Sequence, residues 1–343
     1  MFSNRSLAPS AALVAMSFAI AGCASPQEVA TQRTKDAIAR ELATLTSAAR
    51  ALRDATPAPD PDGWSHTADA QSIENMRAAW RRTRVAYERV EGAVAILFPE
   101  TDVSIDERFD AFVTERADRN LFDGEGVTGM HAIERILWAD STPERVRTFE
   151  QGLPTMPEPG RTPRDATEAT QFRDELVGRL VRDCEAMERQ FRPLALDNAT
   201  AFRGVIGSLE EQLEKIDKAA TSEEESRYAQ FTLADMRANL DGGVTTFEAF
   251  VPWLESVGER ALVTQIRAKF TAIDAAYRAH AGDGIPAVPV GYNPEAPSAE
   301  HTATPYGQLR AMLVAESDPM RRDSLVSLMR RAATAMQIPE LRR

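Results

Sequence analysis

Cysteine is scarce in this chain: its 343 residues include only two, Cys23 and Cys184. The N-terminal segment indicates that Cys23 is modified, which leaves a single thiol and therefore no internal disulfide. The fold must then depend on its buried apolar core. The same scarcity argues against structural zinc and copper(I) sites, because both favour thiolate ligands.

Long apolar runs are also missing beyond the first residues, so we expect no membrane-spanning helix after residue 22. The one apolar run, from Ala11 to Ile20, follows the basic Arg5 and is too short to cross a bilayer. This pattern is typical of a signal peptide over residues 1–22. Its removal leaves 343 − 22 = 321 residues, enough for one large domain or two medium ones.

Small residues stand immediately before Cys23, as the processing of bacterial lipoproteins requires. We therefore expect the Cys23 thiol to receive a diacylglycerol, and acyl chains such as palmitate to anchor the protein stably in a membrane. The next residue is Ala24 rather than the aspartate that favours inner-membrane retention. This favours a periplasm-facing anchor in the outer membrane of the cell envelope, with an unlipidated secreted form as the alternative.

Basic residues are outnumbered, because 40 lysines and arginines face 52 aspartates and glutamates, for a formal charge of −12. A surface this acidic repels phosphate backbones, so we expect no nucleic acid partner. It suits cations instead.

Strand-type alternation is nearly absent and helical periodicity dominates, so we expect an all-α fold. The clearest pattern is an apolar stripe from Met76 to Leu97, which is typical of a bundle seam and ends at Pro99. About ten helices predict two up-and-down bundles, over residues 23–219 and 220–343. The expected helices are 27–55, 76–97, 104–120, 127–139, 164–194, 198–220, 223–256, 258–280, 303–316 and 318–337, with exposed loops at 152–164 and 281–298.

Histidine is scarce as well, with four in the chain, and one of them stands in an informative segment. His131 and Glu134 are three residues apart, so on a helix they share a face and can bind one metal ion together. Such a pair also arises by chance, and the pair alone leaves both interpretations open. The zinc-protease patterns HExxH and HxxEH both fail, because Arg135 stands where the second histidine is needed. The other histidines are expected to be solvated: His66, His280 and His301.

A pair of acidic residues lies upstream of His131, on the helix that is expected to carry the apolar stripe. Glu88 and Glu91 share a helical face, and Glu91 lies close to the stripe. A carboxylate at the edge of a core needs a partner, a proton or a cation, because an unpaired charge is costly to bury. The alternative is that both are solvated residues near Arg84. Further along, Asp106 is placed at the start of another expected helix.

A third acidic cluster, Glu223–Glu225, follows Ser222. This is an ordinary helix start, in which a capping residue precedes negative charge at the positive end of the helix dipole. Capping does not explain Asn239 or the adjacent Gly242 and Gly243 in the middle of the same expected helix, where glycine costs about 1 kcal/mol relative to alanine. Glycine at such a place predicts a close contact between helices.

Together these segments resemble the imelysin family, which includes the EfeO and EfeM iron-uptake proteins. The resemblance covers nearly all of the chain after residue 22, and four blocks in the expected order are more specific than any one of them. The family motif G-x-H-x-x-E is matched by Gly129, His131 and Glu134. The other matching positions are Tyr87, Glu88 and Glu91; Ile105, Asp106, Arg108 and Asp110; and Glu224, Glu225, Arg227, Tyr228, Ala238, Asn239, Asp241 and Gly242.

The resemblance implies two four-helix bundles with a metal site in the cleft between them. The S-H-T-D turn that is common in EfeO relatives is replaced by Ala229–Thr232, so ligation from that turn is not expected. The helices follow Cys23 directly, as in the shorter EfeM type. The residues implied as metal ligands or acidic partners are His131, Glu134, Glu88, Glu91, Asp106 and one of Glu224 and Glu225.

Carboxylates with one imidazole form a ligand set that suits iron, manganese or calcium better than copper(I) or structural zinc. We therefore expect a lipoprotein without catalytic residues that captures ferrous or ferric iron and delivers it to an inner-membrane permease; zinc, manganese, calcium and copper are other candidate metals. A metallopeptidase is an alternative, since founding members of the family were described as peptidases, and Glu91 or Glu134 would serve as its general base. A third possibility is a binding module for an acidic polysaccharide or a surface partner.

Overall fold

The computed structural model describes residues 24–65, 67–107, 120–154 and 158–341, and every regular element among them is helical. This confirms the all-α prediction. Within these ranges, no helix has both the length and the apolar character needed to span a bilayer. The predicted signal peptide, the lipidation site Cys23, and the residues His66, Arg108 and Asp110 lie outside the described residues.

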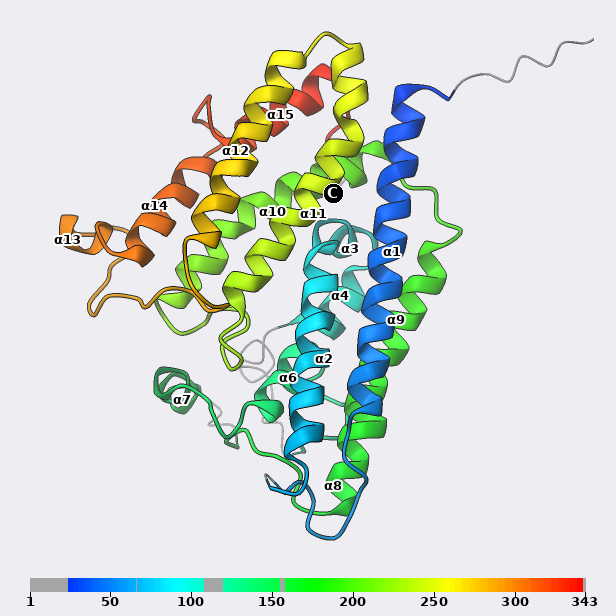
Figure 1. The fold of residues 1–343 in the computed structure, drawn as a ribbon, viewed down its shortest axis with the longest axis vertical. Helices are drawn as coiled ribbons and strands as arrows, with labels where there is room; N and C mark the ends of the chain where they lie inside the picture. The colour runs from blue at the N-terminus through cyan, green and yellow to red at the C-terminus, as the bar shows by residue number, and fades with distance from the viewer. Residues whose placement is uncertain (1–23, 66, 108–119, 155–157, 342–343) are drawn as a thin grey trace, which may run out of the picture.

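The first group of packed helices is built on α1 (Pro26–Asp54), α2 (Ala70–Glu88) and α9 (Val177–Phe191), which run side by side in Figure 1. Helix α1 starts in a capping box, in which Ser25 Oγ accepts the Glu28 N–H and the Glu28 carboxylate accepts the Ser25 N–H. Its buried residues recur every three or four positions, so a single face packs against α2, α9 and α11. They include Ala30, Thr34, Ile38, Leu42, Leu45, Ala49 and Leu52.

Short helices between α2 and α9 carry most of the residues that were predicted to bind a metal. Helices α3 (Glu91–Leu97), α4 (Pro99–Asp106) and α6 (Gly129–Leu137) pack in the first group, α6 against α2, α4 and α9. Helix α7 (Glu144–Gln151) follows and was not predicted. The predicted helix 164–194 is divided into α8 (Ala166–Gln171), a π-helical turn η1 (Phe172–Leu176) and α9.

The second group contains α10 (Asn198–Ala219), α11 (Thr232–Ser256), α12 (Arg260–Arg278), α14 (Pro305–Ser317) and α15 (Leu325–Ala335), with the short α13 (Ala299–Thr302) beside α14. Two of its helices join it to the first group, because α11 packs on α1 and α2 while α10 packs on α3. Helix α10 also packs on α11, α14 and α15. The predicted division of the chain near residue 220 stays a prediction.

The helix predicted over 76–97 is broken at Arg89 and Val90 into α2 and α3. The predicted end before Pro99 is confirmed, because α3 ends at Leu97. Pro99 also begins α4, where the N–H that proline lacks would be unpaired in any case. The expected helix start at Asp106 was also wrong, since Asp106 is the last residue of α4. The chain thus turns twice here, which places Glu88, Glu91 and Asp106 on three separate helices.

The helix predicted from residue 223 begins only at Thr232. Ser222 and Gln230 have φ angles of 66° and 52°, which a right-handed helix does not allow, so the residues between them form turns. We refer to residues 220–231 as the α10–α11 connection. The last predicted helix likewise starts later than residue 318, at Leu325, where the Ser324 hydroxyl caps it.

The close contact predicted at Gly242 is confirmed. A Cβ at this position would overlap the carbonyl oxygen of Arg89, so the missing side chain lets α11 approach the break between α2 and α3. Gly92 of α3 and Gly204 of α10 approach each other in the same way. These contacts hold the ends of α2 and α3, with Glu88 and Glu91, against the second group of helices.

Candidate metal centre

Helix α6 begins where the backbone of Gly129 lies against the end of α4. Gly129 has a φ angle of +83°, and a Cβ there would lie 2.6 Å from the carbonyl oxygen of Ile105, so only glycine fits both the conformation and the space. This contact brings His131 of α6 beside Asp106 of α4, with 3.5 Å between Nε2 of the ring and Oδ1 of the carboxylate.

The ring of His131 is 1% exposed and has a different environment at each nitrogen. Nδ1 lies 2.9 Å from Oε2 of Glu134. The second oxygen of Glu134 accepts the backbone N–H groups of Tyr228 and Ala229 at 2.8 and 2.7 Å, which fixes the carboxylate. Nε2 has no hydrogen-bond partner among the described residues. Histidines that bind metals are held in this way, with one nitrogen on a carboxylate and the other nitrogen left for the ion.

The surroundings also set the charge of this ring. Burial and the nearby Arg84 lower the pKa of His131, but its interactions with Asp106 and Glu134 outweigh both and raise the pKa to about 9. The metal-free ring is therefore protonated at neutral pH. A cation that binds Nε2 has to replace that proton.

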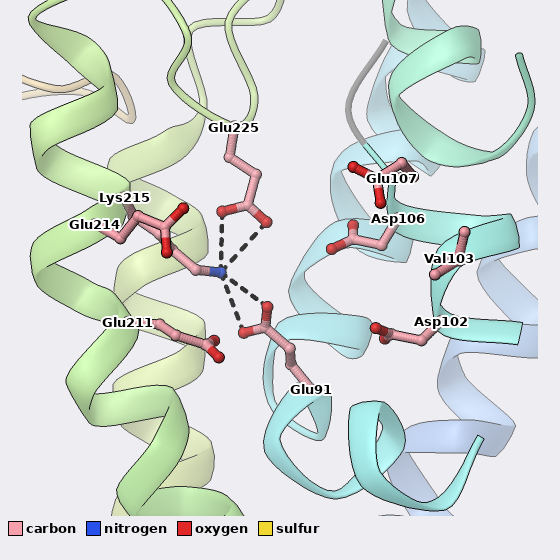
Figure 2. Close-up of a pocket in the computed structure, with 9 residues that line it drawn as sticks. All are labelled: Glu91, Asp102, Val103, Asp106, Glu107, Glu211, Glu214, Lys215 and Glu225. Atoms are coloured by element: carbon pink, nitrogen blue, oxygen red, sulfur yellow. Dashed lines mark hydrogen bonds and ion pairs between the residues drawn. The ribbon is translucent and has the colours of Figure 1, made fainter. Parts of the chain in front are cut away.

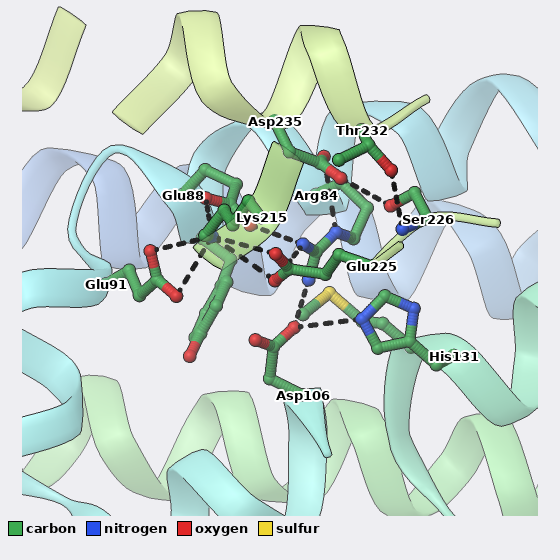
Figure 3. Close-up of polar contacts among 12 residues, drawn as sticks. Arg84, Glu88, Glu91, Asp106, His131, Lys215, Glu225, Ser226, Thr232 and Asp235 are labelled. Carbon is green, nitrogen blue, oxygen red and sulfur yellow. Dashed lines mark hydrogen bonds and ion pairs between the residues drawn. The ribbon is translucent and has the colours of Figure 1, made fainter. Parts of the chain in front are cut away.

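Acidic side chains from four parts of the chain form a cluster that adjoins His131. Ligand atoms of Asp106, His131 and Glu225 all lie within 4.8 Å of one another, and we call these three residues the histidine group. The same spacing is found among Glu88, Glu91, Asp106 and Glu225, which we call the carboxylate group. Figure 3 shows these side chains pointing towards one another from α2, α3, α4 and the α10–α11 connection. The two groups are adjacent because they share Asp106 and Glu225.

Two basic side chains lie among these carboxylates. Arg84 is fully buried and donates hydrogen bonds to Asp106, Glu88 and Glu225, the last at 3.0 Å. Its Nε also lies 3.4 Å from Asp235 of α11, which accepts a hydrogen bond from the Ser226 hydroxyl.

Lys215 of α10 is 5% exposed and lies among three members of the carboxylate group. Its Nζ lies 2.9 Å from Glu88, 3.1 Å from Glu91 and 3.0 Å from Glu225. Figure 2 shows the ammonium between Glu91 and Glu225, with Asp102 and Asp106 across the pocket. Each of the three ammonium hydrogens therefore has a carboxylate to bond.

The positive charges are too few to neutralise the acids that contact them. Five carboxylates contact Arg84 or Lys215, so the formal charge is −5 + 2 = −3 when all are ionised. Burial raises the pKa of Glu91 to about 8 even though Lys215 opposes the shift. At Glu225 burial also favours the neutral form, but Lys215 and Arg84 outweigh it and hold the pKa well below the usual range. The excess negative charge favours the entry of a further cation.

A cavity of about 320 Å³ adjoins the cluster between α4 and α10. Its walls carry almost only acidic groups, some of them exposed to solvent, and its inner end is formed by Lys215. An acidic entrance concentrates cations from solution and excludes anions. The lining residues, drawn in Figure 2, are Glu91, Asp102, Val103, Asp106, Glu107, Glu211, Glu214, Lys215 and Glu225.

The structure thus brings together most of the residues that the sequence predicted: His131, Glu88, Glu91, Asp106 and Glu225. Glu134 adjoins the cluster but faces Nδ1 and two backbone N–H groups. Glu224 lies elsewhere, because its carboxylate is paired with Arg145 and accepts a hydrogen bond from Gln230. Of the two glutamates that the sequence left open, Glu225 is the one in the cluster.

Sequence reasoning missed Lys215 and Asp235. The available signal was the position of Lys215 on α10, where Gln212, Ile216 and Ala219 at neighbouring turns are buried. A lysine within such a face needs acidic partners. Asn239, which capping could not explain, donates a hydrogen bond to Glu91 and accepts one from Gln212.

The sequence and the fold were then compared with known proteins. The family model described as imelysin, peptidase M75, matches residues 30–313. No curated protein matched the sequence. Among solved structures, the chain is similar to an imelysin-like protein from Psychrobacter arcticum 273-4, with a TM-score of 0.54 at 12% identity, over 93% of this chain and 97% of that one. At this identity the similarity concerns the fold alone.

Proposed function

The chain belongs to the imelysin family, and from this we propose that it captures a metal ion, iron first of all, at the histidine group. The observation that carries the proposal is Nε2 of His131, which is buried and held in place through Glu134. It makes no hydrogen bond among the described residues, and its contact there is the 3.5 Å ion pair with Asp106. Beside it lie the carboxylate oxygens of Asp106 and Glu225. A nitrogen with several oxygens is a hard ligand set that suits iron or manganese.

Capture agrees better with this geometry than hydrolysis does. A metallopeptidase must bring a peptide bond and a water molecule to its metal, whereas His131 and Glu225 are only 1% and 6% exposed. An ion that enters through the acidic cavity meets these groups without a polypeptide having to follow it. The carboxylates of the cluster outnumber its two basic side chains, and those that are ionised supply the attraction.

The protein acts in the cell envelope, where lipid on Cys23 anchors it and an inner-membrane permease receives the iron. This part of the proposal rests on the pattern of residues 11–23 and on the resemblance to the EfeO and EfeM proteins. Only Ala24 and Ser25 separate Cys23 from the first residue of α1, so the helical body follows the anchor directly. Iron is the cargo of such a protein rather than a resident cofactor.

The test is metal binding by protein that carries Cys23→Ser and is therefore free of lipid. Ferrous iron is titrated under anaerobic conditions into three forms: the parent, His131→Ala, and His280→Ala as a matched control at a half-buried histidine outside the site. We expect one ion per chain in the parent and the control, and loss of binding in His131→Ala. The same samples are incubated with peptide substrates.

Equal iron binding by the parent and His131→Ala would overturn the proposal. Metal-dependent peptide cleavage that disappears with Glu134→Gln would replace it with the peptidase.

A further inference from the structure

Two groups of candidate ligand atoms lie side by side in this cluster. Lys215 lies among the carboxylates of one group, while Arg84 donates to Asp106 and Glu225, which both groups share. The histidine group and the carboxylate group share Asp106 and Glu225, so these two carboxylates can bridge two neighbouring cations. Within the carboxylate group, Nζ of Lys215 lies 2.9–3.1 Å from Glu88, Glu91 and Glu225. Carboxylates arranged around a common centre in this way resemble the ligand shell of a metal ion, with the ammonium at its centre.

A lysine is a costly occupant for this position. Burying an ammonium removes its hydration, and the loss is recovered only if its hydrogens are paired as well as they are in water. Lys215 meets that condition with three carboxylates at 5% exposure. An apolar residue would otherwise be the simpler choice for a buried position of α10, as at Ile216.

We propose that Lys215 takes the place of a second metal ion, so that the protein holds one metal ion beside a built-in ammonium, and that removal of this ammonium opens a second metal site. The new site consists of Glu88 and Glu91, with Asp106 and Glu225 as bridges to the ion at His131. The inference rests on the proposed function, because the first ion is the captured one. Lys215 therefore determines how many ions the cluster accepts.

The charges agree with this reading. Arg84, Lys215 and the five carboxylates that contact them sum to −3, which one divalent or trivalent ion largely offsets. Without Lys215 the sum, with all five acids ionised, becomes −5 + 1 = −4, which two divalent ions balance. In the variant without Lys215, a second metal ion therefore replaces the positive charge of the ammonium, whereas in the unmodified protein it would have to bind in addition to the ammonium.

The test counts manganese ions in Lys215→Met and in Lys218→Met, a control on the same helix, next to the unmodified protein. Lys218 is half-buried and outside the cluster. Mn²⁺ is used because it accepts the same oxygen ligands as iron and has a strong electron paramagnetic resonance spectrum. Two ions that share carboxylates lie about 3.5–4 Å apart, and at that separation their spins couple, which ions on distant surface sites do not show.

We expect one uncoupled Mn²⁺ per chain in the unmodified protein and in Lys218→Met, and a coupled pair in Lys215→Met. One uncoupled ion in Lys215→Met overturns the inference and leaves the proposed function standing. A coupled pair of ions in the unmodified protein also overturns the inference, because the Lys215 ammonium would then not prevent a second ion from binding. If the unmodified protein takes up no metal while Lys215→Met takes up one ion, the proposed function fails, and the inference fails with it because no first ion then lies beside the ammonium.

Removal of the ammonium leaves buried carboxylates facing one another, so Lys215→Met is also prepared in the presence of Mn²⁺ together with Lys215→Gln, which keeps polar contacts. Folding that depends on Mn²⁺, with two coupled ions per chain, supports the inference. Failure of both variants to fold even with Mn²⁺ assigns Lys215 a purely structural role and overturns it.

Discussion

The carboxylate of Glu134 lies 2.9 Å from Nδ1 of His131, and the Nε2 nitrogen of the same ring faces Asp106. These contacts favour an orienting role for Glu134, acting through the histidine, over the predicted role as a metal ligand. Its second oxygen is used by the N–H groups of Tyr228 and Ala229. The spacing of three residues could not show which of the two side chains would face the ion and which would hold the other in place, whereas these contacts distinguish the two roles.

The first prediction concerns this pair. Glu134→Gln keeps the size of the side chain but loses the negative charge beside Nδ1, so we expect metal affinity to fall about 10- to 100-fold, with the number of bound ions unchanged. Competition titrations with a chelator measure the affinity, and metal analysis at saturation gives the number. A complete loss of binding at saturating metal would instead make Glu134 a direct ligand.

The second prediction concerns pH. The pKa of His131 is about 9 in the fold, against 6.5 for an ordinary histidine, so the protonated ring contributes stability that is complete below about pH 6.5 and lost as pH rises through 9. The full shift corresponds to about 3 kcal/mol. The measurement compares the unfolding free energies of the parent and His131→Gln by urea titration, with a chelator present to remove metal. The difference between the two proteins should shrink by about 3 kcal/mol from pH 6 to pH 10. A difference that is independent of pH would contradict the raised pKa.

The third prediction separates two adjacent glutamates. Glu225→Gln removes a carboxylate that belongs to both ligand groups, so we expect metal affinity to fall by at least about tenfold. Glu224→Gln affects only the pairing with Arg145 and Gln230 and should leave the affinity unchanged. Calorimetric titration of the two variants makes the comparison, with thermal melts as the check on folding. Equal losses in both variants would place Glu224 at the site as well.

The fourth prediction concerns the contact between α3 and α10. A Cβ at Gly204 would overlap the carbonyl oxygen of Gly92, so Gly204→Ala should separate the two helices, lower the unfolding free energy by about 1–3 kcal/mol and weaken metal binding. Gly207 on the same helix has no atom within 4 Å of an added Cβ, and Gly207→Ala should raise stability by about 0.5–1 kcal/mol with binding unaltered. Urea unfolding of both variants measures these changes in stability. A Gly204→Ala variant that is more stable than the parent would show that α3 and α10 are not closely packed at this point.

Much of the fold was predictable because apolar residues recur every three or four positions along a long helix. The first predicted helix, 27–55, agrees with α1 to within a residue at each end, and its apolar face is the buried one. The break between α2 and α3 was not predictable in this way, since the apolar stripe runs on through it. The break arises from tertiary contacts, with Arg89 held against Gly242 of a helix far along the chain.

The candidate site was predictable in its acids and its histidine, and not in its basic residues. His131 and Glu134 are three residues apart on one helix, so their pairing does not depend on how the other helices are arranged. The local sequence gives only one sign that Lys215 is not a solvated lysine, its place on the buried face of α10, because its acidic partners come from α2, α3 and the α10–α11 connection. The connection itself was mistaken for helix, since a run of glutamates after a serine is the composition of a helix start.

The α10–α11 connection serves both sides of His131 at once. It contributes Glu225 to the histidine group, and the backbone N–H groups of Tyr228 and Ala229 donate to Glu134, which contacts the ring. A displacement of this one segment would therefore remove a carboxylate from the histidine group and the support of the imidazole ring at the same time.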